Sequence, residues 1–216
     1  MRARSGARRG TPWTASGCAT GCLEKWQPES AVDHARLALG APFVAPLFAR
    51  FCARARNRAA WVDVRTFYVV RHAKAGSRGH WTGDDRLRPL SKKGLKQAEE
   101  LVNVFKPFPI SAIFSSPYLR CVQTVERLAR AHRLAVETTD SLAEGHGLTG
   151  LNEFFGDRNL DHAVLSTHGD IVWDLVEDLV SRHVIKPGEG GFAKGSTWVL
   201  GVDDSAVAEA RYIPAP

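Results

Sequence analysis

From residue 66 onward the chain alternates short apolar runs with longer amphipathic segments. The runs are rich in aromatic and β-branched residues, which predicts strands at residues 66–70, 112–115, 163–167, 196–202 and 208–212. Apolar residues recur at helical spacing after residues 91, 120 and 169. Ser91 is expected to cap the first of these helices and Pro107 to end it. The alternation predicts an α/β fold, a three-layer sandwich with a mostly parallel central sheet flanked by helices.

Reactive polar residues follow three of the predicted strands. Arg71 and His72 follow the first strand, Ser115 and Ser116 end the second, and His168 follows the third. In open α/β sheets, ligands bind at the carboxyl ends of the strands. We therefore expect these side chains to gather at one edge of the sheet.

The first 65 residues lack such a pattern. They are rich in Arg, Ala, Gly and Trp, and glycines and prolines interrupt any regular period. Their most apolar stretch, residues 37–52, contains two prolines and is shorter than the roughly 20 residues that span a bilayer. We expect residues 1–65 to be a disordered extension, or to lie upstream of a functional start near Val62 or Val64, and residues 66–216 to form the domain.

The positive charge of the chain belongs to this first segment. Residues 1–65 carry 11 Lys and Arg against four Asp and Glu, whereas residues 66–216 carry 18 against 19. A near-neutral domain argues against nucleic acid or an anionic membrane as its partner. Only Cys121 lies in the domain, and Cys18 and Cys22 lack a second pair at zinc-ligand spacing. We expect no disulfide framework, no metal, no cofactor and a cytoplasmic location.

The residues at the strand ends match the needs of phosphoryl transfer. That chemistry requires a nucleophile, cationic donors for the non-bridging oxygens and an acid for the leaving oxygen. His72 is the candidate nucleophile, and Arg71 and Arg120 would keep its imidazole neutral. Both arginines and His168 are candidates to bind the phosphate. Glu144, in a loop that contains glycine, is the candidate acid for the leaving group and base for water.

Other polar residues carry weaker signals. Lys74 and Ser77 are candidates for phosphate contacts, although a loop lysine is more often only solvated. Asp140 lies close to Glu144 in the sequence, which leaves the identity of the proton donor open. The remaining histidines have no motif around them and are interpreted as structural or surface residues.

Three segments resemble the signatures of one family. Residues 70–74 (VRHAK) resemble the RHG-type signature of the histidine phosphatase superfamily, also called phosphoglycerate-mutase-like, with Ala73 where many members carry glycine. Residues 115–124 (SSPYLRCVQT) are similar to its "SSP..R..QT" segment, and residues 166–169 (STHG) to its late "S/T-H-G" segment. The three occur in the family's order within a resemblance that covers about residues 66–212.

The resemblance implies a phosphoglycerate-mutase-like fold and a metal-independent phosphatase. It implies that His72 forms a phosphohistidine, that Arg71, Arg120 and His168 bind the phosphoryl group, and that a carboxylate such as Glu144 is the acid. A small phosphorylated substrate or a phosphohistidine protein is the expected partner. The competing interpretation is a catalytically weak phosphate-binding or regulatory protein on the same fold.

Two branches of the superfamily are the most similar. The compact form, with a "D..RPL...G...A" segment after Asp85 and no large insertion, resembles the phosphohistidine phosphatases and predicts an open site. It also resembles the phosphatase domain that follows a Nudix domain in some bacterial proteins, and residues 194–200 (KGSTWVL) strengthen that likeness. No Nudix box occurs in this sequence, so a Nudix hydrolase partner would be a separate chain. The sequence leaves a phosphomonoester, a phosphoramidate and a nucleotide-type phosphate open as substrates.

Overall fold

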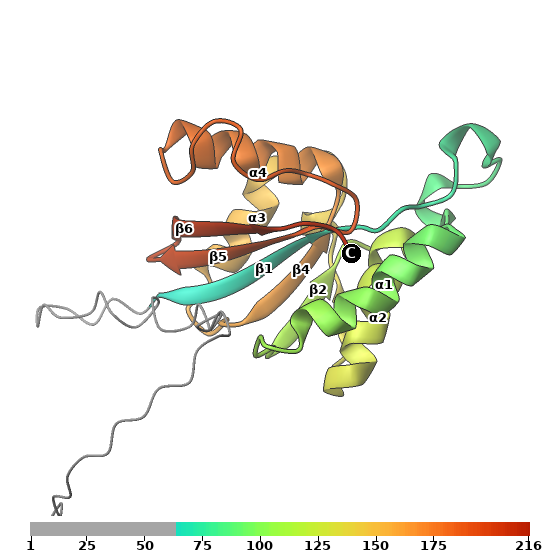
Figure 1. Ribbon diagram of the computed structural model, residues 1–216, viewed down its shortest axis with the longest axis horizontal. Helices are drawn as coiled ribbons and strands as arrows, with labels where there is room; N and C mark the ends of the chain where they lie inside the picture. The colour runs from blue at the N-terminus through green and yellow to red at the C-terminus, as the bar shows by residue number, and fades with distance from the viewer. Residues whose placement is uncertain (1–63) are drawn as a thin grey trace, which may run out of the picture. The chain divides into compact units, whose positions relative to one another are not determined.

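The computed structural model describes residues 64–216, which form a six-stranded sheet with helices on both faces (Figure 1). The strands are β1 (Arg65–Arg71), β2 (Ala112–Ser115), β3 (Val136–Thr138), β4 (Ala163–Thr167), β5 (Thr197–Asp203) and β6 (Ala206–Ile213). The α-helices are α1 (Lys92–Phe105), α2 (Leu119–His132), α3 (Gly147–Gly156) and α4 (Gly169–Ser181). Three short 3₁₀ turns are η2 (Arg78–His80), η3 (Asp85–Leu87) and η4 (Asp140–Leu142).

The sheet has the strand order β3-β2-β4-β1-β5-β6. The pairs β3–β2, β2–β4 and β4–β1 are parallel, which is the arrangement expected when helices connect successive strands. The final hairpin differs, because β5 pairs antiparallel with β1 and β6 antiparallel with β5. The predicted α/β sandwich is confirmed, with a parallel half and an antiparallel half in its sheet.

Strand β1 separates two hydrophobic cores. Phe67 and Val69 point to a core built with α3 and α4, whereas Tyr68 and Val70 point to a core built with α1 and α2. All four side chains are buried. This alternation is the period-2 pattern of a strand buried on both faces, and it explains why β1 is apolar at every one of these positions.

Local signals at the first helix are confirmed. The Ser91 hydroxyl accepts a hydrogen bond from the Gly94 amide at 3.2 Å, and α1 ends at Phe105, before Pro107. Two elements were not predicted. Strand β3 has three residues, mostly exposed, and α3 carries a glycine at each end and a third in its middle, so neither has a clear sequence pattern.

The described domain begins slightly earlier than expected. Strand β1 starts at Arg65, one residue before the predicted boundary, and the Arg65 side chain is buried. Its guanidinium donates hydrogen bonds of 2.5 Å to the carbonyls of Phe155 and Asp157 at the end of α3, where helix carbonyls lack partners within the helix. The rest of the predicted extension, residues 1–63, lies outside the described residues. Within residues 64–216, none of the helices is long and apolar enough to cross a membrane.

Candidate active site

Three strand ends bring the predicted segments together. Strand β4 lies between β1 and β2, so all three parallel strands end at one edge of the sheet. The backbone amide of His72 donates to the Thr167 carbonyl at 2.9 Å, and that of Ser116 donates to the Ser166 carbonyl at 2.9 Å. The segments around residues 71, 116 and 168 are therefore neighbours, as their positions after the strands predict.

Two helices begin at the same edge. His168 is the N-cap of α4, and Arg120 lies in the first turn of α2. The N-terminus of a helix presents unpaired backbone N–H groups and a partial positive charge, which favour a bound anion. The edge thus combines two helix N-termini with the side chains of Arg71, Arg120 and two histidines.

His72 is held in a defined tautomer. Its side chain is buried, and its Nδ1 lies 2.8 Å from the Ala73 carbonyl, which can only accept a hydrogen bond. Nδ1 therefore carries the proton, and the neutral ring keeps a free lone pair on Nε2. Burial lowers the pKa of His72 to about 3; the hydrogen bond to Ala73 opposes this shift, and the charges of Arg120 and Arg71 and any proton on His168 add to it. His72 is neutral at pH 7 and has the form that a nucleophile requires.

Arg120 is the buried cation of the site. One terminal nitrogen contacts Asp85 through both its backbone carbonyl (2.9 Å) and its carboxylate (3.1 Å), and the other donates to the Glu144 carboxylate at 2.9 Å. The Tyr118 ring lies 4.5 Å from the guanidinium carbon, a cation–π distance. The Arg120 Nε is buried and has no hydrogen-bond partner among residues 64–216. Arg120 is thus fixed in orientation at the pocket.

His168 lies beside His72, with ring centroids 5.5 Å apart. Its Nε2 is 2.7 Å from the Ser116 hydroxyl, and its Nδ1 is 3.3 Å from both Arg120 and the Glu144 carboxylate. Burial lowers the pKa of His168 to about 3, and the charge of Arg120 adds to this effect. Both pocket histidines are therefore neutral at pH 7.

Glu144 lies in the loop between η4 and α3 and reaches two of the other predicted residues. Besides Arg120 and His168, its carboxylate contacts Arg78 at 3.4 Å. The side chain is 36% exposed, so water and a leaving group have access to it. The geometry suits a group that moves protons at the edge of the pocket. Asp140, the sequence neighbour considered as an alternative donor, instead contacts Arg86 at 3.7 Å.

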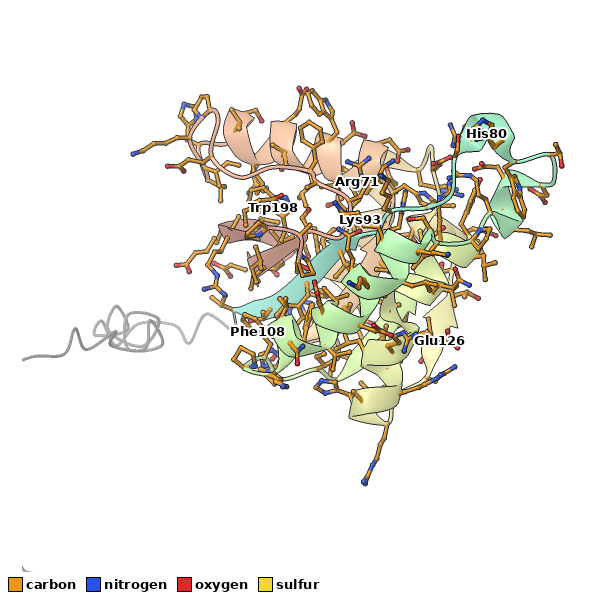
Figure 2. The ribbon with its side chains drawn as sticks, turned by 45° about the vertical axis from the view of Figure 1, so that its right-hand side comes forward. Arg71, His80, Lys93, Phe108, Glu126 and Trp198 are labelled. Atoms are coloured by element: carbon orange, nitrogen blue, oxygen red, sulfur yellow. The ribbon has the colours of Figure 1, made fainter. Side chains whose placement is uncertain are left out.

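Arg71 lies at the end of β1 (Figure 2). One terminal nitrogen donates to the Phe192 carbonyl, and the buried Nε has no partner among residues 64–216. The guanidinium fills the space beside Gly169, where a Cβ atom would lie 2.3 Å from Nη2. Only glycine allows this approach. Arg71 precedes His72 in the chain and packs against Gly169, which follows His168, so all three residues belong to one site.

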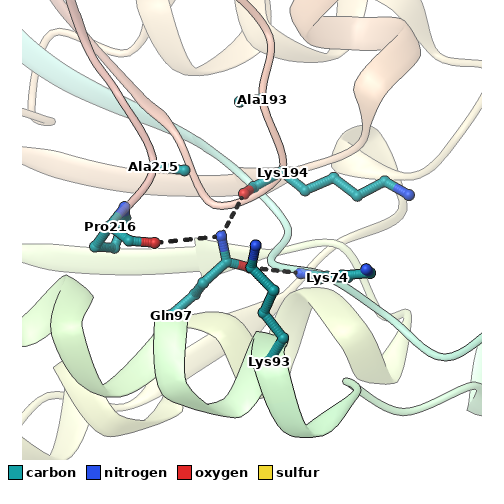
Figure 3. Close-up of a pocket in the computed structure, with 7 residues that line it drawn as sticks. All are labelled: Lys74, Lys93, Gln97, Ala193, Lys194, Ala215 and Pro216. Carbon is teal, nitrogen blue, oxygen red and sulfur yellow. Dashed lines mark hydrogen bonds between the residues drawn. The ribbon is translucent and has the colours of Figure 1, made fainter.

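Lys74 and Ser77 lie apart from this group. Lys74 lines an adjacent cavity of about 350 Å³ together with Lys93, Gln97, Ala193, Lys194, Ala215 and Pro216 (Figure 3). Gln97 joins its walls, because its side chain accepts from the Lys74 amide at 3.0 Å and donates to the Lys194 carbonyl at 2.9 Å. Ser77 is exposed and its hydroxyl does not cap η2. The structure thus places Lys74 beside the pocket and shows no contact between Ser77 and the pocket residues.

Asp85 was not singled out from the sequence. Its carboxylate contacts Arg120, Arg88 and Arg78, and the hydrogen bond from Arg88 is the largest cause that holds the pKa of Asp85 below its usual range. The sequence shows only an acidic residue in an arginine-rich loop, and this local pattern does not identify the arginines with which Asp85 pairs.

The predicted "SSP..R..QT" segment also contains two supporting residues. The Thr124 hydroxyl accepts from the Ala73 amide at 2.9 Å, and the Gln123 side chain accepts from the Leu90 amide at 2.9 Å. These bonds hold both ends of the loop that follows His72. Cys121 is buried nearby, and burial raises the pKa of its thiol to about 12, so it remains protonated. Within residues 64–216 no three His, Cys, Asp or Glu side chains gather as metal ligands.

Comparisons with known proteins agree with the geometry. Residues 67–153 match the family model of the histidine phosphatase superfamily (branch 1). Over 162 residues the chain is 36% identical to the 8-oxo-(d)GTP phosphatase of Mycolicibacterium smegmatis, covering 72% of this chain and 50% of that protein. Over 93 residues it is 31% identical to the transcription factor tau 55 kDa subunit of Saccharomyces cerevisiae, covering 38% of this chain and 21% of that one. The chain thus spans about half the length of the first relative and less of the second.

Solved structures share the fold. SixA from Agrobacterium tumefaciens superposes with a TM-score of 0.57 and 24% identity, covering 70% of this chain and 98% of that chain. The protein histidine phosphatase SixA complexed with tungstate superposes with a TM-score of 0.55 and 20% identity, covering 69% and 94%. At this identity the likeness establishes the α/β architecture of the described residues.

Proposed function

Because the chain belongs to the histidine phosphatase superfamily, we propose that its domain removes a phosphoryl group from a substrate through a phosphohistidine on His72. The observation that carries the proposal is the tautomer of His72. With the proton on Nδ1 held by the Ala73 carbonyl, the Nε2 lone pair is free to attack phosphorus. Arg71, Arg120 and the two helix N-termini supply the positive charge that the transferring oxygens need.

The first step transfers the phosphoryl group to His72. A bond forms between Nε2 and phosphorus while the bond from phosphorus to the leaving oxygen breaks. Glu144, a carboxylate in the structure, takes up one proton when the substrate binds and passes it to the leaving oxygen. In the structure Glu144 contacts Arg120, and a substrate phosphate competes for that same guanidinium, which frees the carboxyl group to face the leaving oxygen.

The second step releases phosphate. Glu144, now a carboxylate, takes a proton from water, and the resulting hydroxide attacks the phosphorus of phospho-His72. The bond from phosphorus to nitrogen breaks, and neutral His72 and protonated Glu144 are restored. Every step uses side chains that lie within one cluster, and the low pKa of His72 keeps its lone pair available.

We propose a nucleotide-type phosphate as the substrate class. The support is the name of the Mycolicibacterium relative, an 8-oxo-(d)GTP phosphatase, which is 36% identical to this chain. A catalytically weak phosphate-binding or regulatory protein is the second candidate, and its support is the relative named as a transcription-factor subunit. The buried His72 and the Glu144 carboxylate beside His168 favour the enzyme.

Activity of the full-length chain on a substrate panel tests the proposal. The panel contains nucleotides, a phosphohistidine protein, sugar phosphates and an aryl phosphate. We expect His72→Ala to lower kcat/KM by at least about a thousandfold, because the covalent intermediate cannot form. His80→Ala serves as the control, since His80 is exposed in the projecting loop (Figure 2) and its side chain forms no hydrogen bond or ion pair within residues 64–216.

A chemical trap for the intermediate separates the two candidates. Rapid quenching of the wild type with labelled substrate is expected to yield an acid-labile, alkali-stable phosphoprotein that His72→Ala lacks. Substantial turnover by His72→Ala would contradict the role of His72. Calorimetric binding of phosphates without any release of phosphate by the wild type would favour the regulatory candidate.

A further inference from the structure

Two exposed aromatic side chains stand beside the pocket. Trp173 on α4 is 46% exposed and Phe192, in the loop before β5, is 43% exposed. Their ring centroids lie 4.8 Å apart at an interplanar angle of 72°, an edge-to-face pair. The two rings contact each other but are exposed, so packing of the hydrophobic core does not account for them. Exposed apolar surfaces of this kind can mark a binding site.

The aromatic pair is tied to the phosphate-binding end through Arg71. The Phe192 backbone carbonyl accepts a hydrogen bond from the Arg71 guanidinium. Trp173 lies four residues after Gly169, one turn along α4 on the same side of the helix, and Gly169 is the residue against which Arg71 packs. The Phe192 backbone therefore contacts Arg71 directly, and Trp173 lies one helical turn from the glycine against which Arg71 packs, so both rings lie near the arginine proposed to bind the phosphate.

The other side of the same loop is strongly cationic. Ala193 and Lys194 follow Phe192 directly and line the cavity that also contains Lys74 and Lys93 (Figure 3). Among residues 64–216, no carboxylate forms an ion pair with any of these three lysines, whose positive charges therefore remain available to a ligand. Pro216 also lines the cavity, with its oxygen 3.5 Å from the Gln97 side-chain nitrogen.

Resting on the function proposed above, we infer that the aromatic pair of Trp173 and Phe192 stacks the base of a nucleotide whose phosphates extend toward Arg71 and the three lysines. A nucleobase has the planar π-face that stacks on aromatic rings, and it is joined to several negative charges. A sugar phosphate has no such face. A phosphohistidine on a protein surface would bring one phosphate, which leaves the lysine cavity without a role.

Binding to a chain that cannot turn over tests this inference. In full-length His72→Ala, calorimetry would measure the Kd of guanosine diphosphate and of inorganic pyrophosphate, which has two phosphates but no base. We expect guanosine diphosphate to bind more tightly. Trp173→Leu and Phe192→Leu are each expected to weaken its binding by about 5- to 150-fold and so to narrow the difference between the two ligands.

Matched variants separate stacking from general apolar contact. Trp173→Phe keeps a ring and is expected to retain most of the affinity that Trp173→Leu loses. Leu95→Ala removes another exposed apolar side chain, 39% exposed on α1, and is expected to change neither Kd. Trp81, 37% exposed on the loop that follows His72, is the alternative stacking partner.

Three results would overturn the inference. The first is equal binding of guanosine diphosphate by Trp173→Leu, Phe192→Leu and their parent. The second is a loss of affinity for guanosine diphosphate in Trp81→Leu, with no loss in Trp173→Leu or Phe192→Leu. The third is an effect of the pair only on dephosphorylation of a phosphohistidine protein, which would make it a protein-docking surface. Failure of the phosphohistidine mechanism would appear separately, as His72-independent turnover, because these affinities are measured without turnover.

Discussion

At the scale of single residues, the pocket depends on histidines that remain uncharged. Both His72 and His168 are buried, and both have a pKa of about 3 because burial and neighbouring arginines disfavour the imidazolium form. The same surroundings that prepare a neutral nucleophile also make protonation costly. Folding and the proposed chemistry are therefore linked through the same two side chains.

This linkage predicts a pH-dependent stability. Between pH 6.5 and about pH 3 the unfolded chain binds protons at these histidines and the folded chain does not, so the free energy of unfolding rises with pH. The contribution of the two neutral histidines to the free energy of unfolding is complete above pH 6.5. It is lost as the pH falls toward 3, and each histidine lowers the free energy of unfolding by up to about 1.4 kcal/mol per pH unit. Urea unfolding at pH 7, 6 and 5 measures the slope.

A variant assigns that slope to its source. His72→Gln is expected to lower the slope between pH 6 and 5 by about half, because one of two titrating groups is gone. His80→Gln removes an exposed histidine and should leave it unchanged. An identical slope in His72→Gln and the wild type would contradict the assignment. Asp85 does not contribute to the slope between pH 6 and 5, because its lowered pKa lies below this pH range.

At the scale of elements, the loop of residues 73–90 controls the geometry of the buried arginine. This loop projects from the end of β1 and returns to α1 (Figure 1). Thr124 and Gln123 hold the two ends of the loop by hydrogen bonds. Asp85, in the part of the loop that precedes α1, contacts Arg120. Arg120 is therefore oriented by two segments, the loop through Asp85 and the segment before α3 through Glu144.

Removal of the Asp85 carboxylate tests this control. Asp85→Ala is expected to lower kcat/KM by about tenfold or more and the free energy of unfolding by about 1–3 kcal/mol, because Arg120 loses a charged partner and stays buried. Glu126→Ala breaks the exposed pair with Arg130 and should cost less than about 1 kcal/mol with no change in kcat/KM. Equal activity of Asp85→Ala and the wild type would show that the loop does not orient Arg120. Steady-state kinetics and urea unfolding provide both readouts.

At the scale of the whole chain, Arg65 bears on where the domain begins. The sequence predicts that residues 1–65 add nothing to the fold, but Arg65 is the first residue of β1 and bonds to the end of α3. We propose that the folding unit includes Arg65 and that the segment before Val62 is dispensable. The excess positive charge of the chain lies in that segment, because residues 1–61 carry ten Lys and Arg against three Asp and Glu.

Two truncated chains test the boundary. A chain starting at Val62 is expected to match the full chain in melting temperature and kcat/KM. A chain starting at Thr66 loses the Arg65 guanidinium and is expected to be less stable by about 2 kcal/mol or more, because two hydrogen bonds from a charged group are lost and the buried Phe155 carbonyl is left unpaired. A marked loss of activity in the Val62 chain would mean that earlier residues contribute to the domain. Thermal melts and steady-state kinetics compare the three chains.

The sequence alone determined the features that depend on local order. The apolar run of β1, the Ser91 cap and the residues that follow β1, β2 and β4 could be recognised because strand and helix periods and capping signals act over a few residues. Parallel strands end at one edge, so those positions also predicted which segments would meet. Strand β3 and α3 escaped prediction because one is too short and the other too rich in glycine to carry a period.

Only the tertiary structure decided how the gathered residues are held. Asp85 and Arg120 are 35 residues apart, Arg71 and Phe192 are 121 apart, and Gln97 reaches Lys194 across 97. No local pattern encodes such pairs, because each depends on how helices and loops pack around the sheet. The exposed pair of Trp173 and Phe192 follows from the same packing. The sequence predicted a neutral His72 from the charges of Arg71 and Arg120, but only the folded chain shows that burial is the main cause of its lowered pKa.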